Sequence, residues 1–537
     1  MTNSYLTLES VSFVLPGGLP LFSQLSETFD SRPTGLVGPN GVGKSVLAQI
    51  MAAKLAPSSG RCTRSGRVFY LPQQISPTPH TTVAELAGVQ PIIEALSRIE
   101  HGSTSAVDFD LVGNNWNIHQ QLLLQLERCG LRGLHASTPA HRLSGGEAMR
   151  VALAGAWLCE ADFMILDEPS NHLDHTALLQ LITELHLWHG GLLVVSHDRV
   201  LLESMARVVE LSPSGLNNYG GNYSFYSRQI RHETENALHL LRQRKHERQR
   251  EQKNILKQKA CLEQRQSRGN RQRADANQAK ILLGRQKQRS ETSAGKVKLQ
   301  HSERLEQLNQ QVRDASSRVG ENAEIVLHSP STNRLFSRHL AELSEVQLPF
   351  ISTLFPSIEL EVTGQARIGI VGRNGSGKST LLKVIAGQLQ PLSGHCRTTD
   401  AQAWLDQHLT GLDPHRSVLE QVLEANQTAG EATLRMRLAQ LGLDAAKIQQ
   451  PAVSLSGGER VKATLACKLY ADPAPRLLLL DEPSNHLDLT SIRALETMLD
   501  AWNGALIVVS HDRFFLENLH LTLRLTLEGN SWRLEPW

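Results

Sequence analysis

Two stretches of the chain carry the residues needed to hold a nucleoside triphosphate. Each reads G-x-x-x-x-G-K-S, in which glycines let backbone N–H groups face inward, the lysine reaches the outer phosphates and the serine hydroxyl is placed for Mg²⁺. The first copy consists of Gly38, Pro39, Asn40, Gly41, Val42, Gly43, Lys44 and Ser45. The second copy consists of Gly372, Arg373, Asn374, Gly375, Ser376, Gly377, Lys378 and Ser379.

Acidic residues that could handle Mg²⁺ and water follow two apolar runs. Asp167-Glu168 comes directly after residues 163–166, and Asp481-Glu482 comes after residues 477–480. Phosphoryl transfer requires neutralised phosphate charge and a water placed in line with the bond that breaks. We therefore expect each Asp to hold Mg²⁺ and each following Glu to polarise the water.

A Gln and a His complete each set. Both glutamines follow short apolar runs and can contact Mg²⁺ and the attacking water, whereas both histidines end later apolar runs and can hydrogen-bond the γ-phosphate. The predicted catalytic residues are Glu168, Glu482, His197, His511, Gln73 and Gln407. The predicted magnesium ligands are Ser45, Gln73, Asp167, Ser379, Gln407 and Asp481.

The string Leu-Ser-Gly-Gly-Glu occurs at residues 143–147 and again at residues 455–459. A hydroxyl, two glycines and the start of a helix form a second anion-binding device. The device lies too far along the chain to serve the loop of its own half, so we expect it to act on a nucleotide held by the other half. Lys44 would then work with Ser456, and Lys378 with Ser144. The predicted contacts are Ser144, Gly145, Gly146, Ser456, Gly457 and Gly458.

The whole set recurs in one order and at nearly one spacing. The lysine and the glutamine are 29 positions apart in both halves, and the aspartate and the histidine are 30 positions apart in both. An isolated Asp-Glu or His at a strand end is more often structural, but an internal repeat of this kind favours two functional sites. The glutamine and the signature serine are 71 positions apart in the first half and 49 in the second, so the first half carries an insertion, which we place around residues 95–116.

Strands and helices must position these residues. Each phosphate-binding loop follows an apolar run of strand length and opens a helical run, and the acidic pairs and histidines end further buried strands, which predicts an α/β fold. The sequence predicts helices from about residue 81 to residue 134, interrupted by a segment rich in Gly, Asp and Asn at residues 102–115.

A basic segment separates the two halves. Residues 228–318 contain 23 Lys and Arg against 10 Asp and Glu, a net charge of +13 in a chain whose total is only +2. The segment lacks Pro, and the widely spaced apolar residues of its outer parts, residues 233–264 and 298–319, predict two long helices paired as a hairpin. Residues 266–273 are the predicted tip, where Arg268, Arg271 and Arg273 would contact RNA. A charged coiled coil is also often only a solvated spacer, and that alternative stays open.

The composition bounds the class of protein. A chain of 537 residues that is 40% hydrophobic and 20% charged suggests about three globular domains. No apolar run approaches the roughly 20 residues that span a bilayer, and the first residues lack the basic and apolar segments of a signal peptide. The six cysteines form no C-x-x-C pair, which argues against a zinc site and a disulfide framework. We expect a cytoplasmic protein without membrane insertion.

These residues resemble the ATP-binding cassette superfamily. The phosphate-binding loops match its Walker A motif, the Leu-Ser-Gly-Gly-Glu strings its signature, the Asp-Glu pairs its Walker B motif with the catalytic Glu, and the two histidines its switch His. Asp174 and Asp488 match the D-loop. Two cassettes on one chain, a charged helical linker and the repeated Asp-Glu-Pro-Ser-Asn-His-Leu-Asp string are similar to the ABC-F branch.

The resemblance implies an architecture and an activity. It implies nucleotide-binding domains at residues 1–227 and 326–537, each a mixed sheet flanked by helices plus a helical subdomain, joined by a basic helical-hairpin linker at residues 228–325. It implies an ATPase that uses ATP and Mg²⁺ at two composite sites, formed when the cassettes pair within a monomer. It also implies ribosome binding, with the linker reaching rRNA or tRNA, in translation or in protection against antibiotics.

The sequence departs from the family pattern in two places. The first half has Leu15 near the place where the family has an aromatic residue that stacks on adenine, and its insertion is shorter than the arm of housekeeping members. In the second half Phe350 is the candidate for the adenine-stacking residue. Two other functions stay open: the energising subunit of a transporter with a separate membrane partner, and a cassette ATPase of DNA repair. The long coiled coils of repair ATPases usually interrupt one cassette, whereas this linker joins two.

Overall fold

The computed structural model describes residues 5–73, 81–143, 145–159, 161–171, 173–274, 302–316, 339–349, 357–372, 375–405, 411–485, 487–528 and 531–537. The chain divides into two compact units. One unit comprises residues 1–226 and 325–537 and contains both cassettes, and the other comprises residues 227–324.

The first cassette is built on a six-stranded sheet in the order β5-β6-β7-β3-β8-β9. Its strands are β3 (Thr34–Val37), β5 (Val68–Leu71), β6 (Phe163–Asp167), β7 (Gly191–Val195), β8 (Arg207–Ser212) and β9 (Gly215–Gly220). The sheet is mixed, because β9 pairs antiparallel with β8 while the other pairs are parallel. β3, β6 and β7 are buried along their whole length, as strands covered on both faces must be.

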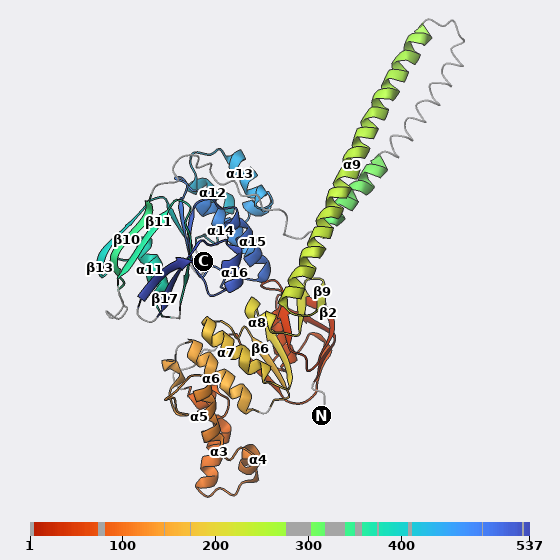
Figure 1. Ribbon diagram of the computed structural model, residues 1–537. Coiled ribbons are helices and arrows are strands. Elements are labelled where there is room, and N and C mark those ends of the chain that lie inside the picture. Colours follow the sequence, from red (N-terminus) through yellow and green to blue (C-terminus); the bar gives the residue numbers. More distant parts are fainter. Residues whose placement is uncertain are drawn as a thin grey trace. The chain divides into compact units, whose positions relative to one another are not determined.

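Alternate residues of β6 enter two different cores. Phe163 and Ile165 pack with α1 (Lys44–Met51) and with a three-stranded antiparallel sheet, whereas Met164 and Leu166 pack with three helices on the opposite face. The antiparallel sheet has the order β2-β1-β4 and consists of β1 (Leu6–Val14), β2 (Pro20–Phe29) and β4 (Ser59–Arg64). The three helices are α6 (Gly145–Leu158), α7 (His175–His186) and α8 (Arg199–Glu203), labelled in Figure 1.

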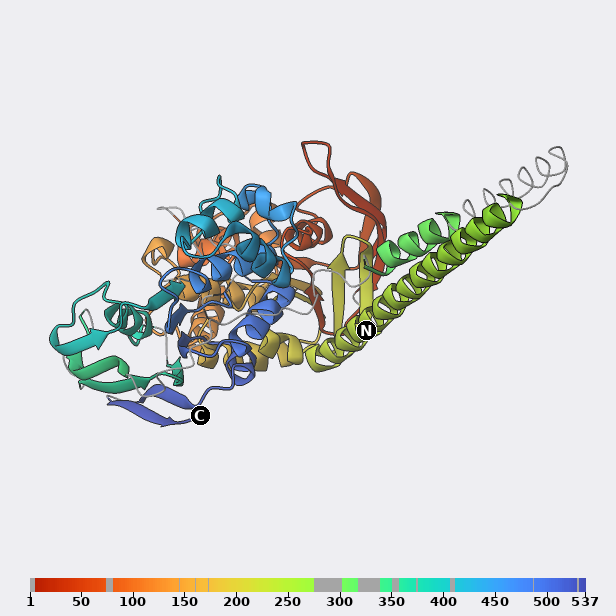
Figure 2. The same ribbon diagram turned by 90° about the horizontal axis from the view of Figure 1, so that it is seen from above.

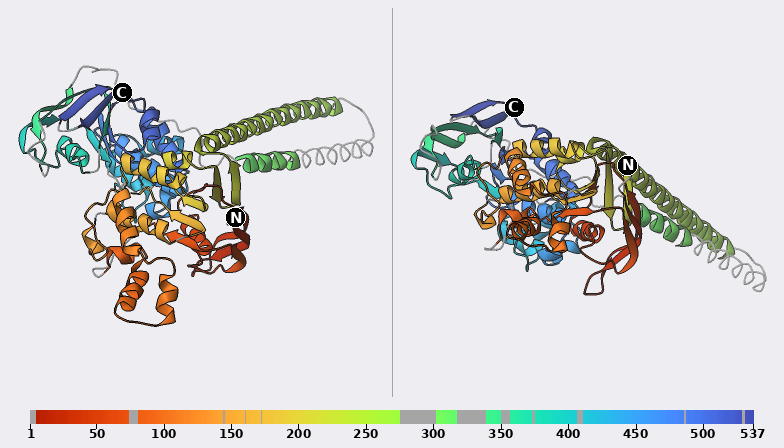
Figure 3. Two further views of the ribbon diagram at one scale, coloured as in Figure 1. Left: turned by 60° about the horizontal axis from the view of Figure 1, so that its bottom comes forward. Right: turned by 90° about the horizontal axis from the view of Figure 1, so that it is seen from below.

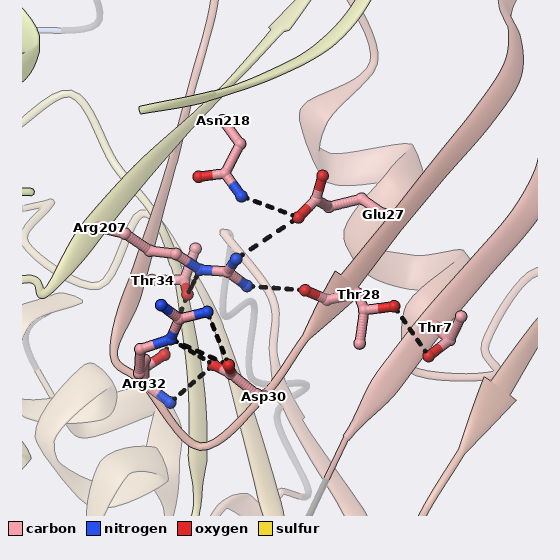
Figure 4. Close-up of polar contacts among 8 residues, drawn as sticks. All are labelled: Thr7, Glu27, Thr28, Asp30, Arg32, Thr34, Arg207 and Asn218. Carbon is pink, nitrogen blue, oxygen red and sulfur yellow. Dashed lines mark hydrogen bonds and ion pairs between the residues drawn. The ribbon is translucent and has the colours of Figure 1, made fainter. Parts of the chain in front are cut away.

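A buried arginine joins the two sheets of the first cassette (Figure 4). Arg207 on β8 donates to Oγ1 of Thr34 on β3 and to the carbonyl oxygen of Thr28 on β2, both at 2.9 Å. Its Nη1 lies 3.4 Å from Oε1 of Glu27, which also accepts from Nδ2 of Asn218 on β9 at 2.9 Å. Since a buried guanidinium needs partners for its charge and its donors, these groups fix the antiparallel sheet against β3, the strand that leads into the first phosphate-binding loop.

The rest of the first cassette is a helical subdomain. It consists of α2 (Val83–Leu86), α3 (Gln90–Glu100), α4 (Ala106–Val112), α5 (Ile118–Arg128) and the 3₁₀ turn η1 (Ala140–Arg142). The prediction of a non-helical interruption at residues 102–115 is wrong, because α4 lies inside it. Asp108 on α4 accepts from Arg98 on α3 at 2.8 Å and from Ser103 at 2.7 Å. This contact holds α3 and α4 together as a pair that stands out from the rest of the subdomain (Figure 3, left).

The second cassette repeats this architecture. Its six-stranded sheet has the order β14-β15-β16-β12-β17-β18, and its antiparallel sheet has the order β11-β10-β13. The strands are β10 (His339–Gln347), β11 (Ile358–Thr363), β12 (Arg367–Val371), β13 (Ser393–Thr398), β14 (Gln402–Leu405), β15 (Leu477–Asp481), β16 (Ala505–Val509), β17 (Leu523–Glu528) and β18 (Ser531–Pro536). The helices are α11 (Lys378–Ile385), α12 (Val418–Ala425), α13 (Glu431–Gln440), η2 (Lys447–Gln449), η3 (Ala452–Ser454), α14 (Gly457–Leu469), α15 (Leu489–Asp500) and α16 (Arg513–Asn518). The predicted α/β fold with two tandem cassettes is confirmed.

The second unit contains most of α9 (Tyr223–Ala274), which Figure 2 shows as one unbroken helix, and a helix at residues 302–316. Leu241 of α9 and Ala315 are buried, and the half-buried Ala237, Leu238 and Val312 pack against them, so the two helices contact each other there. The hairpin as a whole stays a prediction, but its predicted tip at residues 266–273 is wrong, since α9 continues through these positions. The side chains of the three predicted RNA-binding arginines lie outside the described part. Among the described helices, none has the length and apolar composition needed to cross a bilayer.

Candidate active site

The first phosphate-binding loop runs from the end of β3 to the first residue of α1. Gly43 precedes α1 at φ 101°, and a Cβ on Gly38 would lie 2.2 Å from the carbonyl oxygen of Leu211, so both positions require glycine. Lys44 is buried, and its Nζ donates to the carbonyl oxygens of Gly38 at 2.7 Å and Pro39 at 3.0 Å. The loop thus curls around its own lysine at the positive end of a helix, which is the arrangement that binds phosphate.

The second loop has the same geometry where it is described. Gly377 precedes α11 at φ 91°, and Nζ of Lys378 donates to the carbonyl oxygen of Gly372 at 2.8 Å. The hydroxyl of Ser376 is buried and has no hydrogen-bond partner within the described residues, so it can serve a bound group. Arg373 and Asn374 lie outside the described residues.

In each cassette a predicted Ser ligand and a predicted Asp ligand of Mg²⁺ lie together at the carboxyl end of β6 or β15. Oγ of Ser379 donates to Oδ1 of Asp481 at 3.0 Å. At the first site, burial raises the pKa of Asp167, and hydrogen bonds from Ser45 and Tyr70 oppose that shift. Oδ1 of Asp167 is buried without a hydrogen-bond partner in the described part of the chain, as expected of an atom that binds a cation. A hydroxyl next to a carboxylate is a donor set that fits Mg²⁺.

The two predicted catalytic glutamates adopt the same unusual backbone conformation. Glu168 has φ 51° and Glu482 has φ 46°, and their N–H groups donate to Val195 at 2.8 Å and to Val509 at 2.9 Å across the sheet. Left-handed backbone in a non-glycine residue costs free energy and is concentrated at functional sites. Burial raises the pKa of Glu168 to about 8 and that of Glu482 to about 7.

Each glutamate faces the predicted switch histidine of its own cassette. Nε2 of His197 lies 3.6 Å from Oε1 of Glu168, and Nε2 of His511 lies 3.2 Å from Oε1 of Glu482. Burial, reinforced by the charge of the loop lysine, lowers the pKa of His197 to about 3 and that of His511 to about 4. Both imidazoles are therefore neutral near pH 7 and can donate one hydrogen bond and accept another.

Each site also receives an aspartate from the other cassette. Asp488, which caps α15 by accepting the N–H of Ser491 at 2.8 Å, accepts the N–H of Asn40 in the first loop at 2.8 Å. Asp174 caps α7 in the same way, and burial lowers the pKa of Lys378 while the charges of Glu482 and Asp174 oppose that shift. The two D-loop aspartates thus act across the contact between the cassettes.

One cavity of about 930 Å³ is lined by residues of both cassettes. Residues from both loops line it, together with both glutamates, both histidines, Gln73 and Leu15. Gln73 and Leu15 thus lie at the predicted site, and the role of each stays a prediction. Gln407 and Phe350 lie outside the described residues.

The signature residues that the structure describes do not line this cavity. Ser456 caps α14, where its hydroxyl accepts the N–H of Glu459 at 3.4 Å and its N–H donates to Oε2 of Glu459 at 3.0 Å. The described residues that line the cavity do not include Gly145, Gly146 or residues 456–458. Ser144 lies outside the described residues. The pairing of Lys44 with Ser456 and of Lys378 with Ser144 therefore stays a prediction.

Sequence reasoning missed one residue at the first site. The hydroxyl of Tyr70 donates to Oδ2 of Asp167 at 3.4 Å, and burial followed by the charge of Asp167 raises the pKa of Tyr70 to about 12. The repeat could have pointed to this residue. Tyr70 lies three positions before Gln73, and the equivalent position before Gln407 holds Trp404, which has no hydroxyl. This tyrosine makes the two predicted magnesium sites chemically different.

The sequence matches a known family and curated relatives. A family model described as ABC transporter matches residues 27–171 and 355–485. The probable ATP-binding protein YheS of Escherichia coli strain K12 is 30% identical over 511 residues, which cover 91% of this chain and 73% of that protein. The ATP-binding cassette sub-family F member 3 of Mus musculus is 29% identical over 527 residues, covering 94% of this chain and 68% of the mouse protein.

The fold has neighbours among solved structures. The archaeal ribosome recycling factor aABCE1, in a crystal structure of its complex with the archaeal ribosomal stalk protein aP1, superposes with a TM-score of 0.59. The superposition covers 98% of this chain and 89% of that chain at 20% sequence identity. At this identity the likeness concerns the fold alone.

Proposed function

This chain belongs to the ABC-F branch of the ATP-binding cassette family, and on that premise we propose that it hydrolyses ATP at two composite sites to control its binding to the ribosome. It would act in the cytoplasm as a monomer, in translation or in protecting the ribosome from antibiotics. ATP binding and hydrolysis are common to the family. The ribosome, the two composite sites and the roles of individual residues are the proposal.

The observation that carries the proposed hydrolysis is the buried Glu–His pair, present in both cassettes. A general base works best with a pKa near the pH of the reaction, and burial brings both glutamates into that range. Each glutamate would accept a hydrogen bond from the attacking water and orient it. The neutral histidine beside it would hydrogen-bond the γ-phosphate without adding charge.

The remaining groups would hold the nucleotide and its cation. Lys44 and Lys378 would turn from their loop carbonyls to the β- and γ-phosphates. Ser45 with Asp167, and Ser379 with Asp481, would hold Mg²⁺, with Gln73 and Gln407 as further ligands. When bound, the ion neutralises phosphate charge.

The composite character of the sites is supported by the hydrogen bond between Asn40 and Asp488. This bond already brings a residue of the second cassette to the first loop. Closing on ATP would have to add Ser456 to Lys44 and Ser144 to Lys378, because the described signature residues do not line the cavity.

The charge of the linker supports the ribosome as partner, because residues 228–318 carry a net charge of +13. A protein of the same fold, the archaeal neighbour, is called a ribosome recycling factor, but that likeness concerns the fold alone and the proposal rests on the basic segment. A basic helix gains affinity for rRNA or tRNA through release of condensed counterions. An ATPase subunit of a transporter would have no evident use for such a segment.

Ribosome co-sedimentation with the double variant Glu168→Gln/Glu482→Gln tests the function. Hydrolysis should fall at least about 10²-fold, because water loses its base, while ATP binding persists. The ATP-bound protein should then remain on ribosomes that wild type leaves, whereas Lys44→Ala/Lys378→Ala should not accumulate there. If ATP gives the Glu→Gln protein no more ribosome binding than wild type, hydrolysis does not drive release. Retention on DNA instead of ribosomes would favour the repair alternative.

A further inference from the structure

A buried ion pair joins the two cassettes outside the nucleotide cavity. Arg199, the first residue of α8, is only 2% exposed, and its Nη1 donates to Oε1 of Glu496 on α15 at 2.5 Å. The charge of Asp512, at the start of α16, also acts on Arg199. A buried charge that loses its partner is strongly destabilised, so this pair ties the position of α8 to that of α15.

Among the described residues, this ion pair has no counterpart at the equivalent positions of the repeat. At the place in α7 that corresponds to Glu496, counted from the capping Asp174, the chain has Ile182, which packs against the apolar core. The counterpart of Arg199 is Arg513, an exposed residue whose Nε donates to Glu517 of its own helix at 2.8 Å. Within the described chain, the repeat that placed the same Glu–His pair in both cassettes did not produce two equivalent contacts between them.

The far end of α8 is held as firmly as its start. Glu203, its last residue, accepts from Nδ2 of Asn222 at 2.7 Å and from the N–H of Ser224 at 2.8 Å, which fixes the first turn of α9. The guanidinium of Arg199 lies 5.9 Å from the ring centre of Tyr223 in that turn. α8 is thus fixed to the second cassette at one end and to α9 at the other.

α8 begins two residues after the switch histidine of the first site. Asp198 accepts the N–H groups of Val200 and Leu201 at 2.9 and 3.0 Å, so the segment that carries His197 is bound to the start of the helix. A shift of α8 must therefore move the backbone of His197. His511 precedes α16 in the same way, but the described contacts give Arg513 no partner in the first cassette.

We propose that Arg199 is a positioning residue for ATP hydrolysis at the first site: its pair with Glu496 couples the placement of His197 to the docking of the second cassette. The second site lacks this coupling. The proposal rests on the proposed hydrolysis but not on the ribosome. It predicts that two sites with the same catalytic groups respond differently to loss of one ion pair.

Single-site proteins test the proposal. Glu482→Gln leaves only the first site able to hydrolyse ATP, and Glu168→Gln leaves only the second. Arg199→Met should lower kcat of the Glu482→Gln protein about ten- to hundredfold, because the histidine is displaced from its productive position, with KM for ATP unchanged since the phosphate loop is untouched. The Glu168→Gln protein should lose no more than about twofold. Arg513→Met is the matched control and should change neither protein.

Two further variants distinguish a positioning role of Arg199 from a loss of folding. Glu496→Gln keeps an acceptor for Nη1 of Arg199 while removing the charge and should give a smaller loss confined to the first site. The exchange Arg199→Glu/Glu496→Arg should restore part of the lost kcat. Equal losses at both sites, or a loss as large with Arg513→Met, would mean that the pair only stabilises the fold and would overturn the proposal. Absence of hydrolysis in both single-site proteins would overturn the proposed function itself, and with it this inference.

Discussion

The backbone N–H of Asn40 donates a hydrogen bond to Oδ2 of Asp488 at 2.8 Å, although the two residues belong to different cassettes. The same carboxylate accepts the N–H of Ser491 at 2.8 Å and its hydroxyl at 2.6 Å, at the start of α15. The first phosphate loop is therefore fixed to the helix that also carries Glu496. A shift of α15 in the second cassette would therefore also move the phosphate-binding loop of the first cassette.

Asp488→Ala should affect both stability and the first site. Loss of the helix cap should cost about 1 kcal/mol of the free energy of unfolding, and loss of the bond to Asn40 should raise KM for ATP in the Glu482→Gln background. Asp174→Ala is the matched control, because it removes the equivalent cap from α7. It should lower the melting temperature similarly and leave KM at the first site unchanged. Equal KM values for the two variants would contradict a role for the Asn40 contact.

Lys44→Ala and Lys378→Ala should each lower steady-state ATP turnover substantially. Both lysines are buried against loop carbonyls beside a complete set of Asp, Glu and His, so neither site has the composition of an inactive one. Turnover is measured at saturating ATP, with nucleotide binding measured in parallel. Activity near the wild-type level after removal of either lysine would show that only one site hydrolyses ATP.

Replacing Arg268, Arg271 and Arg273 with Gln should weaken binding to ribosomes and flatten its salt dependence. Each lost phosphate contact should lower the slope of log K against log salt concentration by about one. Basal ATPase activity and the melting temperature should hardly change. The matched control replaces the exposed Arg397, Arg460 and Arg513 of the second cassette. Unchanged affinity at every salt concentration would make the linker a spacer whose charge is incidental.

Asp198→Asn should change how stability depends on pH. Burial raises the pKa of Asp198 to about 6; the charge of Asp512 adds to the shift, while the cap hydrogen bonds and Arg199 oppose it. Because this folded-state pKa lies above the value of about 3.9 in an unfolded chain, the stability from the protonated form is full below about pH 4 and is lost as pH rises through about 6. Asn can still cap α8 but does not titrate.

The measurement is the melting temperature of wild type and Asp198→Asn between pH 4 and pH 7. The variant should gain stability relative to wild type as pH rises across that interval. As the control, Asp400→Asn changes an exposed residue, and its melting temperature should depend on pH in the same way as that of wild type. If the melting temperature of Asp198→Asn also follows pH as that of wild type does, the Asp198 carboxylate is ionised over the whole interval. The cap hydrogen bonds and Arg199 would then offset the effect of burial on its pKa.

The loops, the acidic pairs and the histidines could be predicted from sequence because their geometry is local. A glycine-rich loop between a buried strand and a helix can be recognised within a dozen residues, and a carboxylate that ends a parallel strand must lie at the same edge of the sheet as its neighbours. Glu168 and Glu482 were found in this way. Their positive φ angles could not be inferred, since nothing in the sequence distinguishes them from ordinary strand ends.

Contacts between distant parts of the chain could not be predicted. Arg199 and Glu496 belong to different cassettes, and no local pattern marks either as a partner. The helix α4 was missed because Asp108 reads as a loop residue until Arg98 is seen to neutralise it. The turn predicted at Gly269 failed for a different reason. One glycine costs a helix only about 1 kcal/mol, which a long helix readily absorbs.

The length of α9 has a mechanical consequence. Its 52 residues, at 1.5 Å each, make a rod about 78 Å long whose first turn is held by Glu203 of α8. A tilt of about 5° at that turn would carry the far end of a rigid rod roughly 7 Å, more than one helical pitch. A change in the direction of the first turn that is too small to alter the fold would therefore be a large displacement at the distal end of α9.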